Sequence, residues 1–135
     1  MGDGAQDLIA AAGGQQPGSL RAAIANAMVG LKKQYYGRGP EGAKAFVEDD
    51  YIFVVLEGGL TRNEETLLEA GKEDLVRNYR LAFQEAVTDV AVGAVEELVG
   101  RRVIGYHSQI VFNPTKAFEI FALEPRHQAD DVFEN

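Results

Sequence analysis

The run Tyr51-Ile-Phe-Val-Val-Leu-Glu57 places the tightest limit on how this chain can fold. It is rich in β-branched and aromatic residues, which favour a strand, and both of its alternating faces are apolar. A strand of that kind is usually central in a sheet and covered on both sides. It is also the longest continuous apolar run in the sequence, and it is far shorter than the roughly 20 residues of a membrane span. We therefore expect a layered fold without direct membrane insertion.

A first helix is expected to follow Ser19, because serine favours the position just before a helix. Apolar side chains then recur at three- and four-residue spacing and form one stripe: Leu20, Ala23, Ile24, Ala27, Met28, Leu31 and Tyr35. Gly37 can take the left-handed conformation that ends a helix, and Pro40 cannot continue one. The first helix is therefore expected to end by Gly37.

Two more helices are expected after the strand. Thr61 and Glu64 have the spacing of a capping box, and Gly71 marks the end of the short helix that they begin. The range Lys72–Val99 has the strongest helical periodicity, with one apolar face: Leu75, Tyr79, Phe83, Ala86, Val90, Ala94 and Leu98. As one helix it spans roughly 42 Å, against roughly 23 Å for the strand. This long helix must overhang the sheet, kink near Gly93, or lie against a second copy.

The C-terminal part is predicted to form a β-hairpin. Its strands are Arg102–Phe112 and Lys116–Glu124, and they are joined at Asn113-Pro114-Thr115, where asparagine and proline favour a turn. The order is then α–β–α–α–β–β, an α+β fold with a three-stranded sheet and two main helices. Two helices leave apolar sheet surface uncovered, and such a surface usually marks a partner. We therefore expect a homodimer, built on the long helix, the sheet or both.

A single domain, residues 19–125, is expected between two terminal segments. Residues 1–18 are rich in Gly, Gln and Ala and lack the basic flank and apolar core of a secretory signal, so we interpret them as a flexible leader. Residues 126–135 are interpreted as an acidic tail. Because the chain has no export signal and no cysteine, it is expected in the cytoplasm.

The net charge of −8 argues against nucleic acid as a partner. The Lys and Arg residues are spread along the chain and form no basic stripe. An acidic surface repels the phosphates of DNA, RNA and anionic lipid. Nucleic-acid binding is therefore not expected.

The segment GRGPEG, from Gly37 to Gly42, matches the G-x-G-x-x-G pattern of dinucleotide-binding loops. Those loops lie between a strand and the N-terminus of a helix, which supplies amides and a positive dipole to the phosphate. Here the segment follows the C-terminus of a helix, which is the negative end, and Pro40 lacks an amide hydrogen. We therefore interpret the segment as a helix stop and a tight turn, and we expect no cofactor.

Arg38 is a more specific candidate, because a guanidinium held on a short loop can bind a carboxylate, bicarbonate or phosphate at two points. The pair Gly58-Gly59 precedes the expected helix start at Thr61, which is the polarity that an anion site needs. The full candidate set for an anion or partner contact is Arg38, Gly37, Gly39, Gly58, Gly59 and Thr61. The alternative is structural: Arg38 pairs with a neighbouring acid, and the other residues serve turns and caps.

His107, in the middle of a predicted strand beside Ser108, is a weaker candidate. No G-x-S-x-G, H-E-x-x-H or acidic calcium loop accompanies it. A strand histidine that pairs across the sheet or a dimer seam is the simpler interpretation. An enzyme that uses His107 with a nearby carboxylate is kept as a further hypothesis, beside a small-anion-binding sensor module that uses Arg38 and the glycine loops. Otherwise we expect no catalytic, cofactor-binding or metal-binding residues.

Four segments carry a resemblance to a known family: YYGRGP, LEGGLTRNEETLLEAG, EELVGRRV and HSQIVFNPTKAFEIFALEP. Together they resemble the MpsC family of small bacterial and archaeal domains, over about Ser19 to Pro125. The family is named for a component of a Na⁺-translocating, membrane-potential-generating system, whose membrane partners are linked with the uptake of dissolved inorganic carbon. The resemblance implies a soluble, non-enzymatic accessory or regulatory protein of ion or bicarbonate transport. Such a protein would reach the membrane through a membrane transport-system partner.

Overall fold

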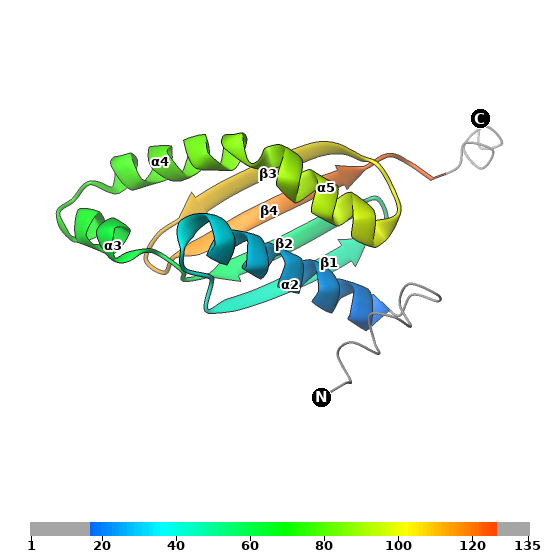
Figure 1. Cartoon of the computed structure of the whole chain (residues 1–135), viewed down its shortest axis with the longest axis horizontal. Helices are drawn as coiled ribbons and strands as arrows, with labels where there is room; N and C mark the ends of the chain where they lie inside the picture. Colours follow the sequence, from blue (N-terminus) through cyan, green and yellow to red (C-terminus); the bar gives the residue numbers. More distant parts are fainter. Residues whose placement is uncertain (1–16, 127–135) are drawn as a thin grey trace.

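The computed structural model describes residues 17–126 (Figure 1). These residues form the helices α2 Pro17–Tyr36, α3 Arg62–Glu69, α4 Glu73–Ala86 and α5 Thr88–Val99, and the strands β1 Gly42–Glu48, β2 Tyr51–Glu57, β3 Val103–Val111 and β4 Lys116–Leu123. The α+β class is confirmed, but the order is α–β–β–α–α–α–β–β. The predicted leader and tail lie outside the described residues, except for Pro17, Gly18 and Arg126.

The sheet is antiparallel throughout and has the strand order β1-β2-β4-β3. The predicted central position of β2 and the predicted hairpin of β3 and β4 are confirmed. The prediction of three strands is wrong, because β1 adds a fourth that pairs with β2 along its whole length. Its sequence, GAKAFVE, begins with residue types that are depleted in strands. Asp49 has φ +57 in the turn to β2, a conformation that aspartate tolerates well.

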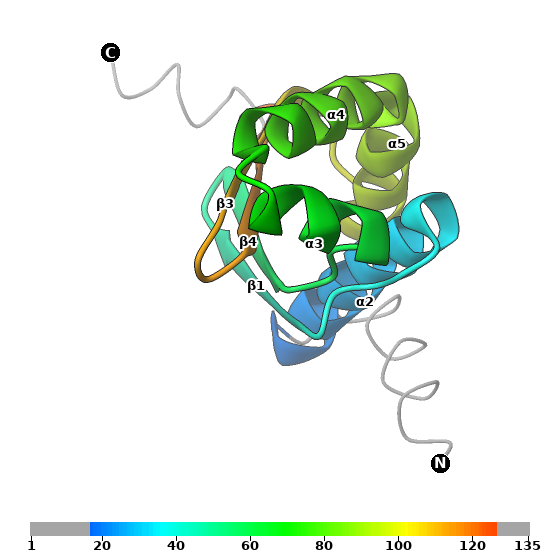
Figure 2. The same ribbon diagram turned by 90° about the vertical axis from the view of Figure 1, so that its left-hand side faces the viewer.

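The helices α2, α4 and α5 lie on one side of the sheet, and α3 lies at one end (Figures 1 and 2). The main core forms between α2, α5 and the sheet, and its fully buried members include Ile24, Met28, Ile52, Val54, Val95 and Phe121. A smaller cluster of Leu60, Val76 and Ile110 lies apart from it, beside α3 and α4. The expectation that β2 is covered on both sides is wrong for the described residues, because its second face carries the exposed Tyr51.

The predicted long helix is two helices that meet at Val87. The backbone of Val87 has φ −107 and ψ 12, which departs from helical geometry. The hydroxyl of Thr88 donates a hydrogen bond to the carbonyl oxygen of Gln84 at 2.9 Å, which satisfies one acceptor at the break. The kink therefore exists, but its predicted position near Gly93 is wrong. Gly93 lies inside α5, where the packing of the helix on the core outweighs the low helix propensity of glycine.

The predicted apolar face of the Lys72–Val99 region is also displaced. The buried residues of α4 and α5 are Val76, Gln84, Ala91 and Val95. Four residues of the predicted face are exposed instead: Leu75, Tyr79, Ala86 and Val90. The inward face escaped prediction because it carries the polar side chain of Gln84.

The ends of the helices follow the predicted signals in most cases. The amide of Thr61 donates to the Glu64 carboxylate at 2.8 Å, and the amide of Glu64 donates to the Thr61 hydroxyl at 3.2 Å, which confirms the capping box. Gly37 and Gly71 have φ values of +83 and +78 just after α2 and α3. Besides the break at Val87, the start of α2 differs, since the helix begins at Pro17, where the missing amide hydrogen is not needed.

Candidate functional site

The structure brings the two predicted glycine loops into contact. The amide of Glu41 donates to the carbonyl oxygen of Glu57 at 2.7 Å. Gly59 has φ +87, and a Cβ atom at this position would lie 3.0 Å from the Cα atom of Pro40 and 3.3 Å from the carbonyl carbon of Gly39. The close approach of two backbone segments therefore requires glycine at position 59.

Arg38 bridges the same two loops. One of its terminal nitrogens, Nη1, donates to the carbonyl oxygen of Leu60 at 3.0 Å and lies 3.7 Å from the Glu65 carboxylate. The other, Nη2, lies 3.6 Å from the Glu41 carboxylate. Because the Arg38 side chain is 46% exposed, solvent screens these pairs. These contacts agree with the alternative in which Arg38 pairs with neighbouring acids. The binding of an anion at Arg38 stays a prediction.

Substituting Gly59 with alanine is expected to lower the free energy of unfolding by roughly 2–4 kcal/mol, from the left-handed backbone and the contact with Pro40 together. Gly71→Ala is the matched control, because its φ is also positive and no heavy atom lies within 4 Å of the added Cβ. The control is expected to cost only about 1–2 kcal/mol. Urea unfolding measures both variants. Equal losses would show that the contact between the loops contributes nothing.

A buried cluster of polar side chains lies between the sheet and the helices. Its centre is Glu119 on β4, which is 0% exposed. The Glu119 carboxylate accepts hydrogen bonds from the hydroxyls of Tyr106 and Ser108 on β3, and it lies 3.0 Å from Nζ of Lys32 on α2. Gln84 on α4 donates to the Tyr106 hydroxyl and accepts from Lys32 at 2.8 Å. The cluster thus joins two helices to two strands.

Two tyrosines beside this cluster are held in the neutral form. Burial, together with the negative charge of Glu119, raises the pKa of Tyr106 far above its usual value. Burial also raises the pKa of Tyr36 to about 12. The Tyr36 hydroxyl is buried and has no hydrogen-bond partner among residues 17–126. Both tyrosines therefore keep their hydroxyl protons at neutral pH. The Tyr106 hydroxyl donates its proton to a hydrogen bond with Glu119, whereas that of Tyr36 forms no hydrogen bond with residues 17–126.

A second buried ion pair connects α4 to the start of α3. Nε and Nη2 of Arg80 donate to the two carboxylate oxygens of Glu64 at 2.6 and 2.5 Å, and Nη2 also donates to the Gly59 carbonyl at 3.2 Å. Burial tends to raise the pKa of Glu64, but the hydrogen bonds from Arg80 and the Thr61 amide outweigh it, and the pKa lies below its usual value. The guanidinium also lies 3.8 Å from the ring centroid of Tyr36. This pair ties α4 to the glycine loop and to α3.

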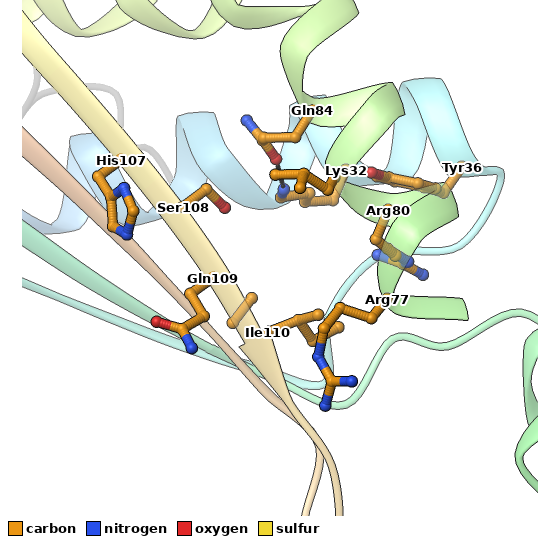
Figure 3. A pocket seen from close by; sticks show the side chains of 11 residues that line it. Lys32, Tyr36, Arg77, Arg80, Gln84, His107, Ser108, Gln109 and Ile110 are labelled. Carbon is orange, nitrogen blue, oxygen red and sulfur yellow. Dashed lines mark hydrogen bonds between the residues drawn. The ribbon is translucent and has the colours of Figure 1, made fainter. Parts of the chain in front are cut away.

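A cavity of about 370 Å³ opens beside the buried cluster, between α4, β3 and the end of α2 (Figure 3). Ser108 and Ile110 on β3 point toward the helices, whereas His107 and Gln109 point to the other side of the strand (Figure 3). His107, the weak catalytic candidate, is exposed at the edge of the cavity. Arg38 and the candidate glycines are not among the residues that line the cavity.

The sequence reasoning missed Glu119, Arg80 and Gln84, although a signal for them exists. Glu119 is flanked at two-residue spacing by Ala117 and Phe121, so it occupies an inward position of an apolar strand. Arg80 and Gln84 follow Val76 at four-residue spacing, on the inward face of α4. A charged or amide side chain at a core position is the sign of a buried polar cluster.

The side of the sheet that faces away from the helices is a second candidate site, here named the outer face. Its apolar members, read from the strand register, are Phe46, Tyr51, Phe53, Val55, Val111, Phe118, Ile120 and Ala122. The ring of Phe53 is stacked between those of Phe46 and Phe118, with centroid distances of 6.1 and 6.0 Å. The charged members are Lys44, Glu48, Glu57 and Lys116. None of the helices in the described part of the chain covers this face (Figure 2).

Comparison with known proteins gives a match to a protein family. A family model described as "Na+-translocating membrane potential-generating system (MpsC)" matches residues 16–125. Searches of the curated proteins and of the solved structures found no match. Among the described residues, no helix is both long enough and apolar enough to cross a bilayer.

Proposed function

Because this chain belongs to the MpsC family, we propose a function within the system for which the family is named. The family is described as a Na⁺-translocating, membrane-potential-generating system. Within such a system, we propose that the chain is a non-enzymatic accessory or regulatory component that acts through protein contacts. The membrane partners of this family are linked with the uptake of dissolved inorganic carbon. Bicarbonate transport is therefore the process to test first. The chain would then meet the membrane through a protein partner.

The observation that carries this proposal is the outer face. Tyr51, Phe46 and Ile120 on this face are 57%, 48% and 39% exposed. Single exposed apolar side chains are common on protein surfaces, but a contiguous apolar patch usually marks a contact with a partner. The three stacked phenylalanine rings make this patch continuous across β1, β2 and β4. It therefore favours a function in assembly.

A second copy of the chain is the occupant that we assign to the outer face. Two chains of net charge −8 repel each other over most of their surface. On the outer face, the two lysines of β1 and β4 offset the two glutamates of β1 and β2, so these four side chains add no net repulsion there. Strands β2 and β4 are the central pair of the sheet, and Glu57 is the register partner of Lys116. A two-fold axis parallel to these strands and midway between them sets Glu57 of one copy opposite Lys116 of the other.

The homodimer predicts a specific effect of Ile120→Glu. Ile120 lies on the central strand β4, and its exposure allows the fold to accept a charge. Two glutamates buried near the two-fold axis of a dimer repel each other, and we expect the dimer to weaken roughly 100-fold or more. Size-exclusion chromatography with light scattering at micromolar concentration measures the mass, and circular dichroism checks the fold.

The matched control is Leu75→Glu, which places the same charge on the exposed face of α4. This variant is expected to remain a dimer. A monomeric wild type would contradict the homodimer. Dissociation by Leu75→Glu, with Ile120→Glu still dimeric, would move the interface to α4.

The cellular test compares the native cell with a strain that lacks this chain. In Na⁺ medium, we expect the strain to show a lower membrane potential and slower uptake of labelled bicarbonate, because the transport system lacks one component. Wild type and Leu75→Glu should restore both quantities, whereas Ile120→Glu should not. An unchanged membrane potential in the deletion strain would contradict the proposal.

A further inference from the structure

The cavity between α4 and β3 has the size and the walls of a small-molecule site. Its volume of about 370 Å³ lies within the usual range for such sites. Leu81, Ile110 and Ala117 contribute apolar walls, and the ring of Tyr36 lies beside Arg80. A ligand with an apolar chain or ring can therefore lie against these side chains.

The charge of the lining has one sign. The charged residues that line the cavity are Lys32, Arg77 and Arg80 and, among the described residues, no aspartate or glutamate joins them. Lys32 and Arg80 each have a buried carboxylate partner, but those carboxylates lie behind the lining. Arg77 pairs only with acids on its own helix, at exposed positions where such pairs are weak. In a chain of net charge −8, this lining selects anions over cations.

The polar groups near the cluster that can still form a hydrogen bond to a ligand are donors. The Glu119 carboxylate is occupied by Tyr106, Ser108 and Lys32. An ammonium group has three N–H donors. That of Lys32 donates to Gln84 and forms an ion pair with Glu119, so at least one N–H is left for a ligand. The hydroxyl of Tyr36 points toward Lys32 and has no partner among residues 17–126 (Figure 3). A buried donor without a partner is costly, and a ligand acceptor would relieve that cost.

We propose that this cavity binds a small organic monocarboxylate, a molecule with one carboxylate group and an apolar chain or ring. The carboxylate accepts hydrogen bonds from the Tyr36 hydroxyl and from the free N–H of Lys32. Its apolar part lies against Leu81 and Ile110. This site is separate from the outer face and does not depend on the proposed function in assembly.

The test uses isothermal titration calorimetry of the full chain with hexanoate and benzoate. Hexanamide is the neutral analogue, and phosphate and bicarbonate are anions without an apolar part. Hexanoate is expected to bind roughly tenfold or more tightly than hexanamide, because hydrogen bonds to a charged group are stronger. Tyr36→Phe should weaken hexanoate roughly tenfold. It should leave the melting temperature of the empty protein unchanged or higher, because the hydroxyl has no partner there.

A pair of leucine variants locates the site. Leu81→Trp enlarges a side chain that lines the cavity and should abolish binding. Leu75→Trp makes the same change at an exposed leucine of the same helix that does not line the cavity, and it should bind as wild type does. The proposal is wrong if neither carboxylate binds, if hexanamide binds as tightly as hexanoate, or if phosphate or bicarbonate binds in place of hexanoate. Undiminished binding to both Tyr36→Phe and Leu81→Trp would also overturn it.

Discussion

Replacing Glu119 with alanine is expected to lower the free energy of unfolding by about 3–5 kcal/mol. Glu119 is fully buried, and its carboxylate is the partner of the Lys32 ammonium, whose side chain is only 12% exposed. Without it, a buried positive charge loses its counter-charge, and the hydroxyls of Tyr106 and Ser108 lose their acceptor. Guanidinium unfolding followed by circular dichroism at neutral pH measures the loss.

Two further variants separate the charge of Glu119 from its position. Glu124→Ala removes an exposed carboxylate just beyond the end of the same strand and should change stability by no more than about 0.5 kcal/mol. The double variant Lys32→Met with Glu119→Leu removes both charges and should recover the part of the loss that comes from the unpaired Lys32 ammonium. The part that comes from the hydroxyls of Tyr106 and Ser108, which still lack an acceptor, should remain. If Glu119→Ala costs no more than Glu124→Ala, the buried cluster is not an energetic centre of the fold.

Arg80→Met is expected to cost about 3–5 kcal/mol at neutral pH, because it leaves the Glu64 carboxylate, only 3% exposed, without its two-point partner. The loss should depend on pH. In wild type the folded-state pKa of Glu64 lies below its usual value of 4.5. Its ionised form therefore contributes stability above that pH, and the contribution is lost as the pH falls through the lowered folded-state pKa.

In the Arg80→Met variant, only the hydrogen bonds from Thr61 still oppose the effect of burial on Glu64, so its folded-state pKa is higher than in wild type. The stability deficit should therefore be largest at neutral pH and should shrink as the solution is acidified to about pH 4. Arg77→Met is the matched control on the same helix. Its partners Glu73 and Asp74 are exposed, so it should cost less than about 1 kcal/mol. Equal losses for the two arginines, or a deficit that is constant with pH, would contradict the assignment.

Local sequence signals predicted the parts of the fold that short-range physics decides. The two apolar faces of Tyr51–Glu57 placed this strand in the centre of the sheet, and the spacing of Thr61 and Glu64 located the start of α3. Strand β1 escaped because its register with β2 supplies the stability that its small residues lack. The break at Val87 escaped because tertiary packing, rather than a glycine, decides where α5 turns onto the core.

The candidate site was much less accessible to prediction. Arg38 and the two glycine loops lie next to each other because the hairpin of β1 and β2 sets the residues before β1 beside those after β2. The cavity instead depends on residues from four separate elements, such as Lys32, Gln84 and Ser108. These residues are far apart in the sequence and come together only when the helices pack on the sheet. A polar residue at a core position signals that such a cluster exists, but it does not name its partners.

The small apolar cluster of Leu60, Val76 and Ile110 divides the molecule into two units of unequal strength. The helices α2 and α5 are anchored in the large core, whereas α3 and α4 are held by this small cluster, by ion pairs and by the ring contacts of Phe83 with Tyr35 and Tyr36. Regions with few buried apolar contacts open at a lower free-energy cost than the molecule as a whole. We therefore expect the unit α3–α4, which is joined to α5 at Val87, to separate from β3 before the rest of the fold opens. Such an opening would admit a ligand to the cavity while the sheet, and any surface formed on its far side, stays intact.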